Sequence, residues 1–298
     1  MNQTPSNRPV LFGEVLFDCF PDGSEVLGGA PFNVAWHLRG FGESPLFISR
    51  VGEDDAGARV RQSMAAWGMD TSGLQTDREH PTGAVRIQLV DGEPRFEILP
   101  DQAYDFIYLA DLPDLGRPAF LYHGSLALRR PESGTTLDTL TAHRNGPVIL
   151  DVNLRPPWWQ LPDILRWTTR ADWVKLNRDE LDLLAPGEGD LAERGRDFMA
   201  RFGLEYLVLT RGAEGALALS ATGEEASVRP AAATRVVDTV GAGDAFTSVF
   251  LLGRLRAWPL AQTLERAQAF ASAIVGVRGA TVSEPDFYRR FLADWGEA

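Results

Sequence analysis

Short apolar runs alternate with amphipathic segments along most of the chain. The runs of strand length are residues 9–18, 45–51, 119–124, 147–152, 172–176 and 205–210. The segments with helical spacing of their apolar positions are residues 29–39, 54–67, 132–143, 177–185, 190–202, 242–256 and 260–276. This alternation predicts an α/β fold with a mainly parallel sheet and helices on both of its faces. Ligands of such sheets bind at the carboxyl ends of the strands.

Two segments have a hairpin pattern instead. Residues 84–99 alternate polar and apolar positions around an Asp-Gly pair, and residues 215–228 turn at Ala-Thr-Gly. The first hairpin is half-exposed in an otherwise α/β pattern, which predicts a lid or a small second sheet. The sequence contains no internal repeat and no low-complexity linker, so we expect a single domain over residues 1–298.

The composition excludes several classes of protein. The chain has 298 residues and a formal net charge of −12, which argues against general binding of nucleic acid. Cys19 is the only cysteine, so an internal disulfide and a cysteine-based zinc site are excluded. No apolar run approaches the ~18 residues of a membrane span, and the first residues lack the pattern of a signal peptide. We therefore expect a cytoplasmic enzyme without a membrane partner.

The main candidate for chemistry is the stretch VVDTVGAGDAFTSVF at residues 236–250. Gly241 and Gly243 allow a tight turn and a close approach of a ligand to the backbone. The amides of this turn become the free donors of the following helix, and such a helix N-terminus binds anions. Asp244 is unfavourable for binding phosphate but suited to accepting a proton. From these residues alone, a plain glycine hinge followed by a first-turn acid is an equal alternative.

Polar side chains follow other predicted strands. Asp18 ends the first strand and suits two adjacent sugar hydroxyls. Asn33 lies about one turn into a helix that opens with a Gly-Gly pair, where it would meet a small polar ligand. Asn153 and Arg155 follow the strand at 147–152, and arginine is a good clamp for phosphate. Each of these residues also fits an ordinary turn between a strand and a helix.

Asn177 and Glu180 lie three residues apart at a predicted helix start and would share one face of it. Their oxygens suit Mg²⁺, usually through waters, and a capping box is the alternative interpretation. The stretch LTRGAEG at 209–215 would let a nucleotide pass beneath a turn. The Walker A pattern is absent and the only lysine, Lys175, lies elsewhere in the sequence. If the protein binds ATP, it does so without a Walker A loop, and the helix dipole, Arg155 and Mg²⁺ would have to meet the charge of a transferred phosphoryl group.

These stretches occur together and in order, and with them the chain resembles the PfkB carbohydrate kinases, the ribokinase-like family, over about residues 9–287. Two stretches resemble the signatures of the family, GGAPFNVAWHLRGFG at 28–42 and DTVGAGDAF at 238–246, and the stretches SRVGEDDAG, KLNRDE and LTRGAEG match between them. DVNLRPPWW and GEVLFD resemble the variant of bacterial fructokinases. The resemblance implies a three-layer α/β/α domain with a mainly parallel central sheet and a small β-sheet lid, with lid strands at about 14–28 and 84–99.

The resemblance also implies roles for single residues. Asp244 would be the catalytic base, and the other residues implied at the reacting centre are Gly241, Ala242, Gly243 and Arg155. The residues implied to bind the sugar are Asp18, Gly28, Gly29, Asn33, Phe96, Asn153 and Asp244. Those implied to bind ATP are Asn177, Thr210, Arg211, Gly212, Gly215, Gly241 and Gly243. Glu180 and Asn177 would hold Mg²⁺ through water, and a K⁺ site would use Asp238, Val240, Gly279 and Ser283.

The expected reaction is transfer of the γ-phosphoryl group of ATP to the 6-hydroxyl of fructose, with a homodimer formed through the lid. The alternatives within the family are 2-keto-3-deoxygluconate kinase, ribokinase and nucleoside kinase. A nucleoside would need an aromatic sandwich, and Phe32 and Phe96 would supply one if Phe32 faced the pocket. We favour the other placement, in which Phe32 points into the core. A non-catalytic sugar or nucleotide sensor is a remote alternative, because the acid and the glycines are all present. An NAD-dependent oxidoreductase is disfavoured, because the dinucleotide fingerprint is absent.

Overall fold

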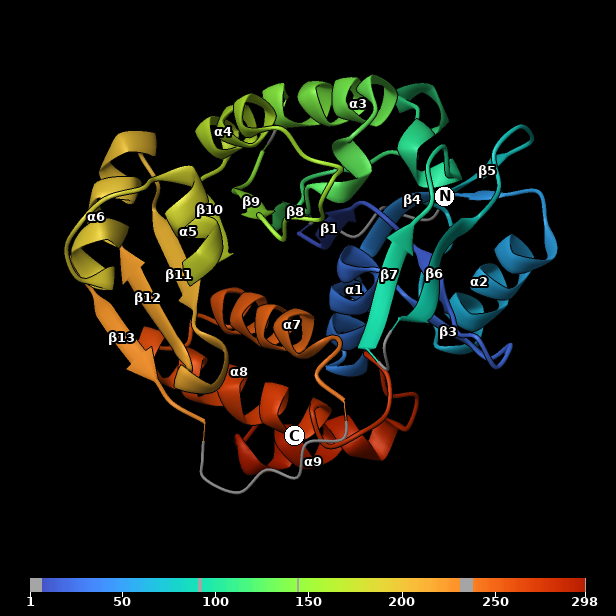
Figure 1. Cartoon of the computed structure of the whole chain (residues 1–298). Coiled ribbons are helices and arrows are strands. Elements are labelled where there is room, and N and C mark those ends of the chain that lie inside the picture. Colours follow the sequence, from blue (N-terminus) through green and yellow to red (C-terminus); the bar gives the residue numbers. More distant parts are fainter. Residues whose placement is uncertain (1–6, 91–92, 144, 231–237, 298) are drawn as a thin grey trace.

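A nine-stranded sheet forms the centre of the molecule (Figure 1). The computed structural model describes residues 7–90, 93–143, 145–230 and 238–297. The strand order is β13-β12-β11-β10-β9-β8-β1-β4-β5, and all neighbours are parallel except at β12. Its strands are β1 (Pro9–Phe12), β4 (Leu46–Gly52), β5 (Leu74–Asp77), β8 (Phe120–His123), β9 (Val148–Asp151), β10 (Trp173–Asn177), β11 (Tyr206–Thr210), β12 (Ala216–Ser220) and β13 (Glu225–Val228).

Helices cover both faces of this sheet, and each face has its own apolar core. One face carries α1 (Ala30–Gly40), α2 (Asp55–Ala66), α7 (Ala242–Leu255), α8 (Leu260–Ile274) and α9 (Pro285–Asp294). The other carries α3 (Pro131–Ala142), α4 (Leu161–Arg170), α5 (Arg178–Leu184) and α6 (Leu191–Phe202). Because both faces are covered, central strands such as β1 and β9 are buried along their whole length. Within the described residues, no helix combines the length and the apolar character needed to cross a membrane.

A second sheet has the order β3-β2-β6-β7. Its strands are β2 (Leu16–Cys19), β3 (Glu25–Gly28), β6 (Gly83–Val90) and β7 (Glu93–Ile98). The expectation of one continuous strand over 9–18 is wrong, because the chain leaves the large sheet at Gly13 and enters the small sheet at Leu16. Gly13 has φ 152°, and a Cβ there would lie 2.5 Å from Cγ of Pro31. A side chain therefore cannot occupy the position where the two sheets separate.

The α/β class, the mainly parallel sheet and the small second sheet are confirmed. Three elements were not predicted. The strand β5 is short and half polar, and the helices α4 and α9 both begin with proline-containing segments that usually indicate turns. Pro162 and Pro285 lie in the first turn of their helices, where a missing N–H costs nothing. The Asp-Gly pair of the first hairpin and residues 236–237 of the glycine-rich stretch lie outside the described residues.

Candidate active site

Residues from distant parts of the sequence meet where α1 and α7 begin, at the carboxyl ends of the central strands. Asp244 lies in the first turn of α7 and Asn33 in the first turn of α1. Nδ2 of Asn33 donates a hydrogen bond of 2.8 Å to Oδ2 of Asp244. This bond spans 211 positions of the sequence and joins the two glycine-rich stretches into one site.

The environment of Asp244 suits a proton acceptor. Burial is the main reason that the pKa of Asp244 rises from 3.8 to about 6, and the hydrogen bond from Asn33 opposes this rise. Lys175 and Arg155 also favour the charged form, whereas Asp151 disfavours it. The carboxyl group is therefore ionised at neutral pH, while its affinity for a proton is higher than that of an ordinary aspartate.

The N-terminus of α7 is built around Gly241. This residue has φ 78°, and a Cβ on it would lie 2.4 Å from Cβ of Ala280. Ala245 makes the first bond within the helix, from its amide to the carbonyl of Gly241, and the amide of Ala242 donates to the carbonyl of Thr239 at 3.3 Å. Among the described residues, the amides of Gly241, Gly243 and Asp244 make no backbone hydrogen bond and remain for an anion, whereas the amide of Ala242, a residue predicted for the reacting centre, is used within the turn. The helix thus presents free donors beside the Asp244 carboxylate.

A recess lined with polar groups lies next to Asp244. A Cβ placed on Gly28 would lie 3.8 Å from Oδ1 of Asn33 and 3.9 Å from Oδ2 of Asp18, so the bare glycine leaves room between these two side chains. Oδ1 of Asn33 is buried and has no hydrogen-bond partner. Burial raises the pKa of Asp18 to about 6, and Arg155 opposes this rise. A ligand with several hydroxyl groups would satisfy these unused acceptors.

Sequence reasoning missed Glu14, which occupies the break between the two sheets. Its Oε1 accepts a hydrogen bond of 3.3 Å from the amide of Ala30, and its Oε2 is buried without a partner. Burial raises the pKa of Glu14 to about 7, with Arg155 opposing and Asp244 contributing to the rise. The signal in the sequence is an acid at position 14 inside an apolar stretch of strand character.

Arg155 and Asn153 follow β9 at the same edge of the sheet. Arg155 is exposed, and its charge lowers the pKa of Glu14, Asp18 and Asp244, which places the guanidinium near all three carboxyl groups. Asn153 is half-buried with φ 40°, a conformation that few residues other than glycine adopt. The backbone therefore turns sharply just after the strand end.

Comparison with known proteins agrees with this geometry. Residues 19–286 match a protein family described as "pfkB family carbohydrate kinase". The chain belongs to this family. The kinase is 34% identical over 257 residues to a fructokinase of Klebsiella pneumoniae, covering 82% of this chain and 83% of that protein. It is 30% identical over 298 residues to an aminoimidazole riboside kinase of Salmonella typhimurium, covering 94% and 92%.

A solved structure shows the same fold as this carbohydrate kinase. It is a double mutant of fructokinase from Vibrio cholerae O395 with fructose, ADP and potassium ion bound. The TM-score is 0.83 at 26% identity, and the match covers 96% of this chain and 99% of the other. The family and the fold together show that this chain is a phosphotransferase with an alcohol group as acceptor, as the sequence predicts.

The residues predicted for Mg²⁺ form a capping box in the kinase. Asn177 accepts a bond from the amide of Glu180, and Oε2 of Glu180 accepts one from the amide of Asn177, both at 2.8 Å. Oε1 of Glu180 accepts a third bond, from the amide of Leu154. The described part of the chain contains no cluster of three His, Cys, Asp or Glu side chains that would hold a metal ion. These residues fit a Mg²⁺ carried by the phosphates of ATP and reached through water, rather than one held directly by carboxylates.

The residues predicted for K⁺ come partly together beside α7. The carboxylate of Asp238 accepts bonds from the amides of Val240 at 2.9 Å and Gly279 at 3.2 Å. These bonds bring the segment before α7 against residues 279–280. Ser283 lies exposed just before α9. Asp238, Val240 and Gly279 are therefore neighbours, and the Asp238 carboxylate already accepts bonds from two backbone amides.

The predicted nucleotide residues lie at the end of β11. Thr210 is the register partner of Asn177 on β10, so the two residues are neighbours at the carboxyl edge of the sheet. The amide of Arg211 donates to the carbonyl of Gly215, and Gly212 has φ 55°. Gly215 has φ 88°, and a Cβ on it would lie 1.9 Å from the carbonyl oxygen of Val228. This tight turn leaves the strand end open to a ligand.

The two phenylalanines that a nucleoside sandwich would need differ in their burial. Phe32 is fully buried, and its ring packs 5.6 Å from Trp36 and 5.7 Å from Phe47, measured between ring centroids. Phe96 lies on β7, and 55% of it is exposed. Phe32 is therefore part of the core, as favoured from the sequence, and the alternative in which Phe32 and Phe96 sandwich a nucleoside is not supported.

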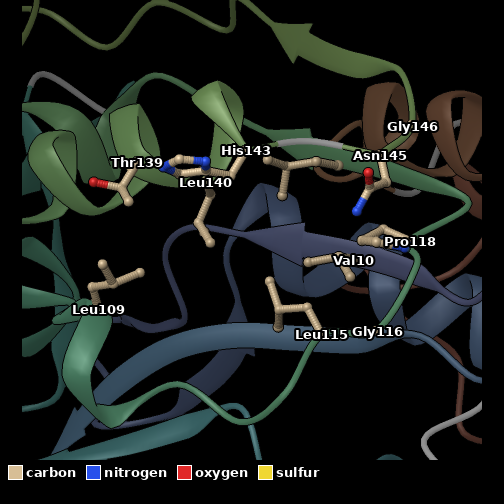
Figure 2. Close-up of a pocket in the computed structure, with 11 residues that line it drawn as sticks. Val10, Leu109, Leu115, Gly116, Pro118, Thr139, Leu140, His143, Asn145 and Gly146 are labelled. Atoms are coloured by element: carbon tan, nitrogen blue, oxygen red, sulfur yellow. The ribbon is translucent and has the colours of Figure 1, made fainter.

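A cavity of about 240 Å³ lies at the amino-terminal ends of the central strands, and Figure 2 shows the residues that line it. It lies against Val10 at the start of β1, Pro118 before β8 and Gly146 before β9, and four of its 11 lining residues are leucines. The candidate site residues lie at the carboxyl ends of the same strands. The cavity is thus separate from the candidate active site.

The structure gives Lys175 a place that the sequence did not predict. From the sequence, Lys175 was seen only to lie outside any Walker A pattern and received no role at the phosphates, but a Cβ on Gly243 would lie 3.6 Å from its Nζ. The ammonium group therefore lies beside the N-terminus of α7. A charged residue inside a buried parallel strand was the signal that would have found it.

Proposed function

We propose that this kinase transfers the γ-phosphoryl group of ATP to the 6-hydroxyl of fructose. The observation that carries the proposal is the polar recess formed by Asp18, Asn33 and Asp244, which offers hydrogen-bond acceptors to hydroxyl groups and no pair of aromatic rings among the residues identified. The similarity to fructokinases, including one solved with fructose and ADP, supports the same substrate.

In the proposed reaction, the 6-hydroxyl oxygen attacks the γ-phosphorus and the bond from that phosphorus to the bridging oxygen of ADP breaks. Asp244 accepts the proton of the hydroxyl group, and Asn33 orients its carboxylate through the 2.8 Å bond. The free amides at the start of α7 stabilise the negative charge on the phosphoryl group, aided by the positive end of the helix. Mg²⁺, when bound with ATP, would neutralise phosphate charge. The products are fructose 6-phosphate and ADP.

We propose that the remaining predicted residues surround this centre. Gly29, next to Gly28, lets the backbone pass close to Glu14, because a Cβ there would lie 2.6 Å from its carbonyl oxygen. We propose that the turn from Thr210 to Gly215 borders the nucleotide and that K⁺ binds between Asp238 and Gly279, as a potassium ion is bound in the fructokinase relative.

We also propose that the small sheet acts as a lid. Val26 of β3 lies within 3.5 Å of a Cβ placed on Gly279, so the small sheet reaches the segment beside α7. Closing such a lid would exclude water and limit hydrolysis of ATP. The exposed Phe96 on β7 would then approach the acceptor or a second copy of the chain, as in the homodimer expected from the sequence.

Aminoimidazole riboside is the second candidate acceptor. The observation that favours it is the match to an aminoimidazole riboside kinase over 94% of this chain. Both acceptors would present a hydroxyl group to Asp244, so the two candidates differ in the part of the recess away from it. The burial of Phe32 in the core favours the sugar over the riboside.

The test is an ADP-release assay with Mg-ATP and K⁺ over fructose, ribose, 2-keto-3-deoxygluconate, aminoimidazole riboside and no acceptor. We expect the highest kcat/KM with fructose. Asp244→Asn should lower kcat by about 10² to 10⁴, the usual contribution of a general base. Asp55→Asn is the matched control, because Asp55 is an exposed acid in the first turn of α2. A preference for aminoimidazole riboside would replace fructose as the assigned acceptor. Normal turnover of Asp244→Asn would show that Asp244 is not the catalytic base.

A further inference from the structure

Lys175 is the only lysine of the chain, and it lies inside the central sheet. On β10 its neighbours Val174 and Leu176 face the core under α3 to α6, so Lys175 points to the opposite face, where α7 packs. A strand buried on both faces normally consists of apolar residues. A lysine at this position costs desolvation of its charge, so the surrounding groups must compensate for it.

Asp151 supplies this compensation. Nζ of Lys175 donates to both oxygens of the Asp151 carboxylate, at 3.0 and 2.8 Å, from the neighbouring strand β9. The hydroxyl of Tyr122 donates to Oδ2 of Asp151 at 3.1 Å, and that of Thr247 approaches it at 3.4 Å. Burial opposes the charge of Lys175, but Asp151 holds the pKa of the ammonium above its ordinary value. Lys175 is therefore a fixed cation at neutral pH.

The ammonium group has one donor to spare. It carries three N–H bonds, and Asp151 uses two of them. The remaining direction is toward α7, since a Cβ on Gly243 would lie 3.6 Å from Nζ. The side chain is 14% exposed, and Gly243 is exposed. The free amides of α7 and the third N–H of Lys175 thus lie side by side at one opening.

Resting on the proposed phosphoryl transfer, we propose that Lys175 is a catalytic residue whose ammonium group contacts the transferred phosphoryl group at the N-terminus of α7. Asp151 is then a positioning residue, because it holds the ammonium group in place and acts only through it. A lysine provides a compact charge, which suits an oxygen of a phosphoryl group in a narrow site. The exposed Arg155 lies near Glu14, Asp18 and Asp244, on the acceptor side of the site, whereas Lys175 would act at the N-terminus of α7.

The first test separates catalysis from simple pairing of charges. Lys175→Met alone leaves Asp151 buried without its cation, so the double variant Lys175→Met with Asp151→Asn serves as the folding control. We expect kcat of the double variant to stay about 10² to 10³ below the wild type, the usual loss when one stabilising donor is removed. The expected KM for ATP changes less than kcat. If the double variant turns over as fast as Asp151→Asn alone, Lys175 is only the partner of Asp151 and the proposal is wrong.

The second test needs no acceptor, so it stands apart from the choice of fructose. Protein grown with lysine labelled with ¹⁵N at the side chain gives one ζ-nitrogen resonance, because Lys175 is the only lysine. We expect this resonance to shift with Mg²⁺ and the β,γ-methylene analogue of ATP, and to shift less with Mg-ADP. Equal positions with both nucleotides would overturn the contact with the γ-phosphoryl group. If the resonance shifts while no acceptor in the panel is phosphorylated, the proposed substrate fails and the role of Lys175 stands.

Discussion

Replacing Asn33 with alanine should move the acid limb of the activity toward neutral pH. The Asn33 amide donates to the Asp244 carboxylate at 2.8 Å and stabilises its ionised form. This bond is one of the causes that keep the pKa of Asp244 from rising above about 6. Without it, the buried carboxylate binds a proton more readily, and the fraction of enzyme with an active base falls.

The size of the shift follows from the energy of the bond. A hydrogen bond to a charged group contributes about 1.5 to 3 kcal/mol, and about 1.4 kcal/mol corresponds to one pKa unit. The midpoint should therefore move up by about one to two units from its starting value of about 6. At pH 7 the ionised fraction of Asp244 would fall from about nine-tenths to about half or less.

The assay is kcat/KM for the acceptor between pH 5 and pH 9, which reports the free enzyme. Asn33→Ala is also expected to raise KM, so the midpoint of the profile is compared and not its height. Asp18→Asn is the control, because burial raises the pKa of Asp18 to about 6 as well. The acid limb of the pH profile is assigned to Asp244. That assignment is refuted if the midpoint does not shift in Asn33→Ala, or if the acid limb disappears in Asp18→Asn.

Two further substitutions test the carboxyl group between the sheets and the placement of Phe32. Burial raises the pKa of Glu14 from 4.5 in the unfolded chain to about 7 in the folded protein. The free-energy cost of burying the ionised carboxylate is therefore complete above pH 7 and absent below pH 4.5. Glu14→Gln should stabilise the free protein by about 3 kcal/mol at pH 8, seen as a higher Tm that returns to the wild-type value near pH 4; an equal gain at both pH values would contradict this reasoning. Phe32→Ala should cost about 3 to 5 kcal/mol in urea unfolding because it empties a core position, while KM for the acceptor stays within about twofold; a tenfold rise of KM would instead place this ring in the pocket.

Sequence reasoning recovers most of the large sheet because its signals are local. The apolar runs of β4, β8 and β11 and the helical spacing of α6 and α7 are short-range patterns, and glycines mark where the chain must approach itself closely. The break at Gly13 escaped prediction because residues 9–18 are apolar on both sides of it. Only the packing of Pro31 against this glycine shows that the strand must end there.

The candidate site divides in the same way. Asp244 and Asn33 stand in glycine-rich stretches and are identified from sequence, but their contact over 211 positions is visible only in the fold. Lys175 and Glu14 were missed for a different reason. Each is a single charge in an apolar strand, and what it does depends on which charges the neighbouring strands and helices bring beside it.

The burial of the only lysine also determines how the surface of the protein behaves chemically. Every other cationic side chain apart from the histidines is an arginine, and guanidinium groups keep their charge far above pH 10. The ε-amine of Lys175 is mostly shielded, with 14% of its side chain exposed. Reagents that acylate amines would therefore attach to the folded chain mainly through its terminal amine. The surface charge should stay nearly constant in alkaline solution, where a lysine-rich protein would lose its cations.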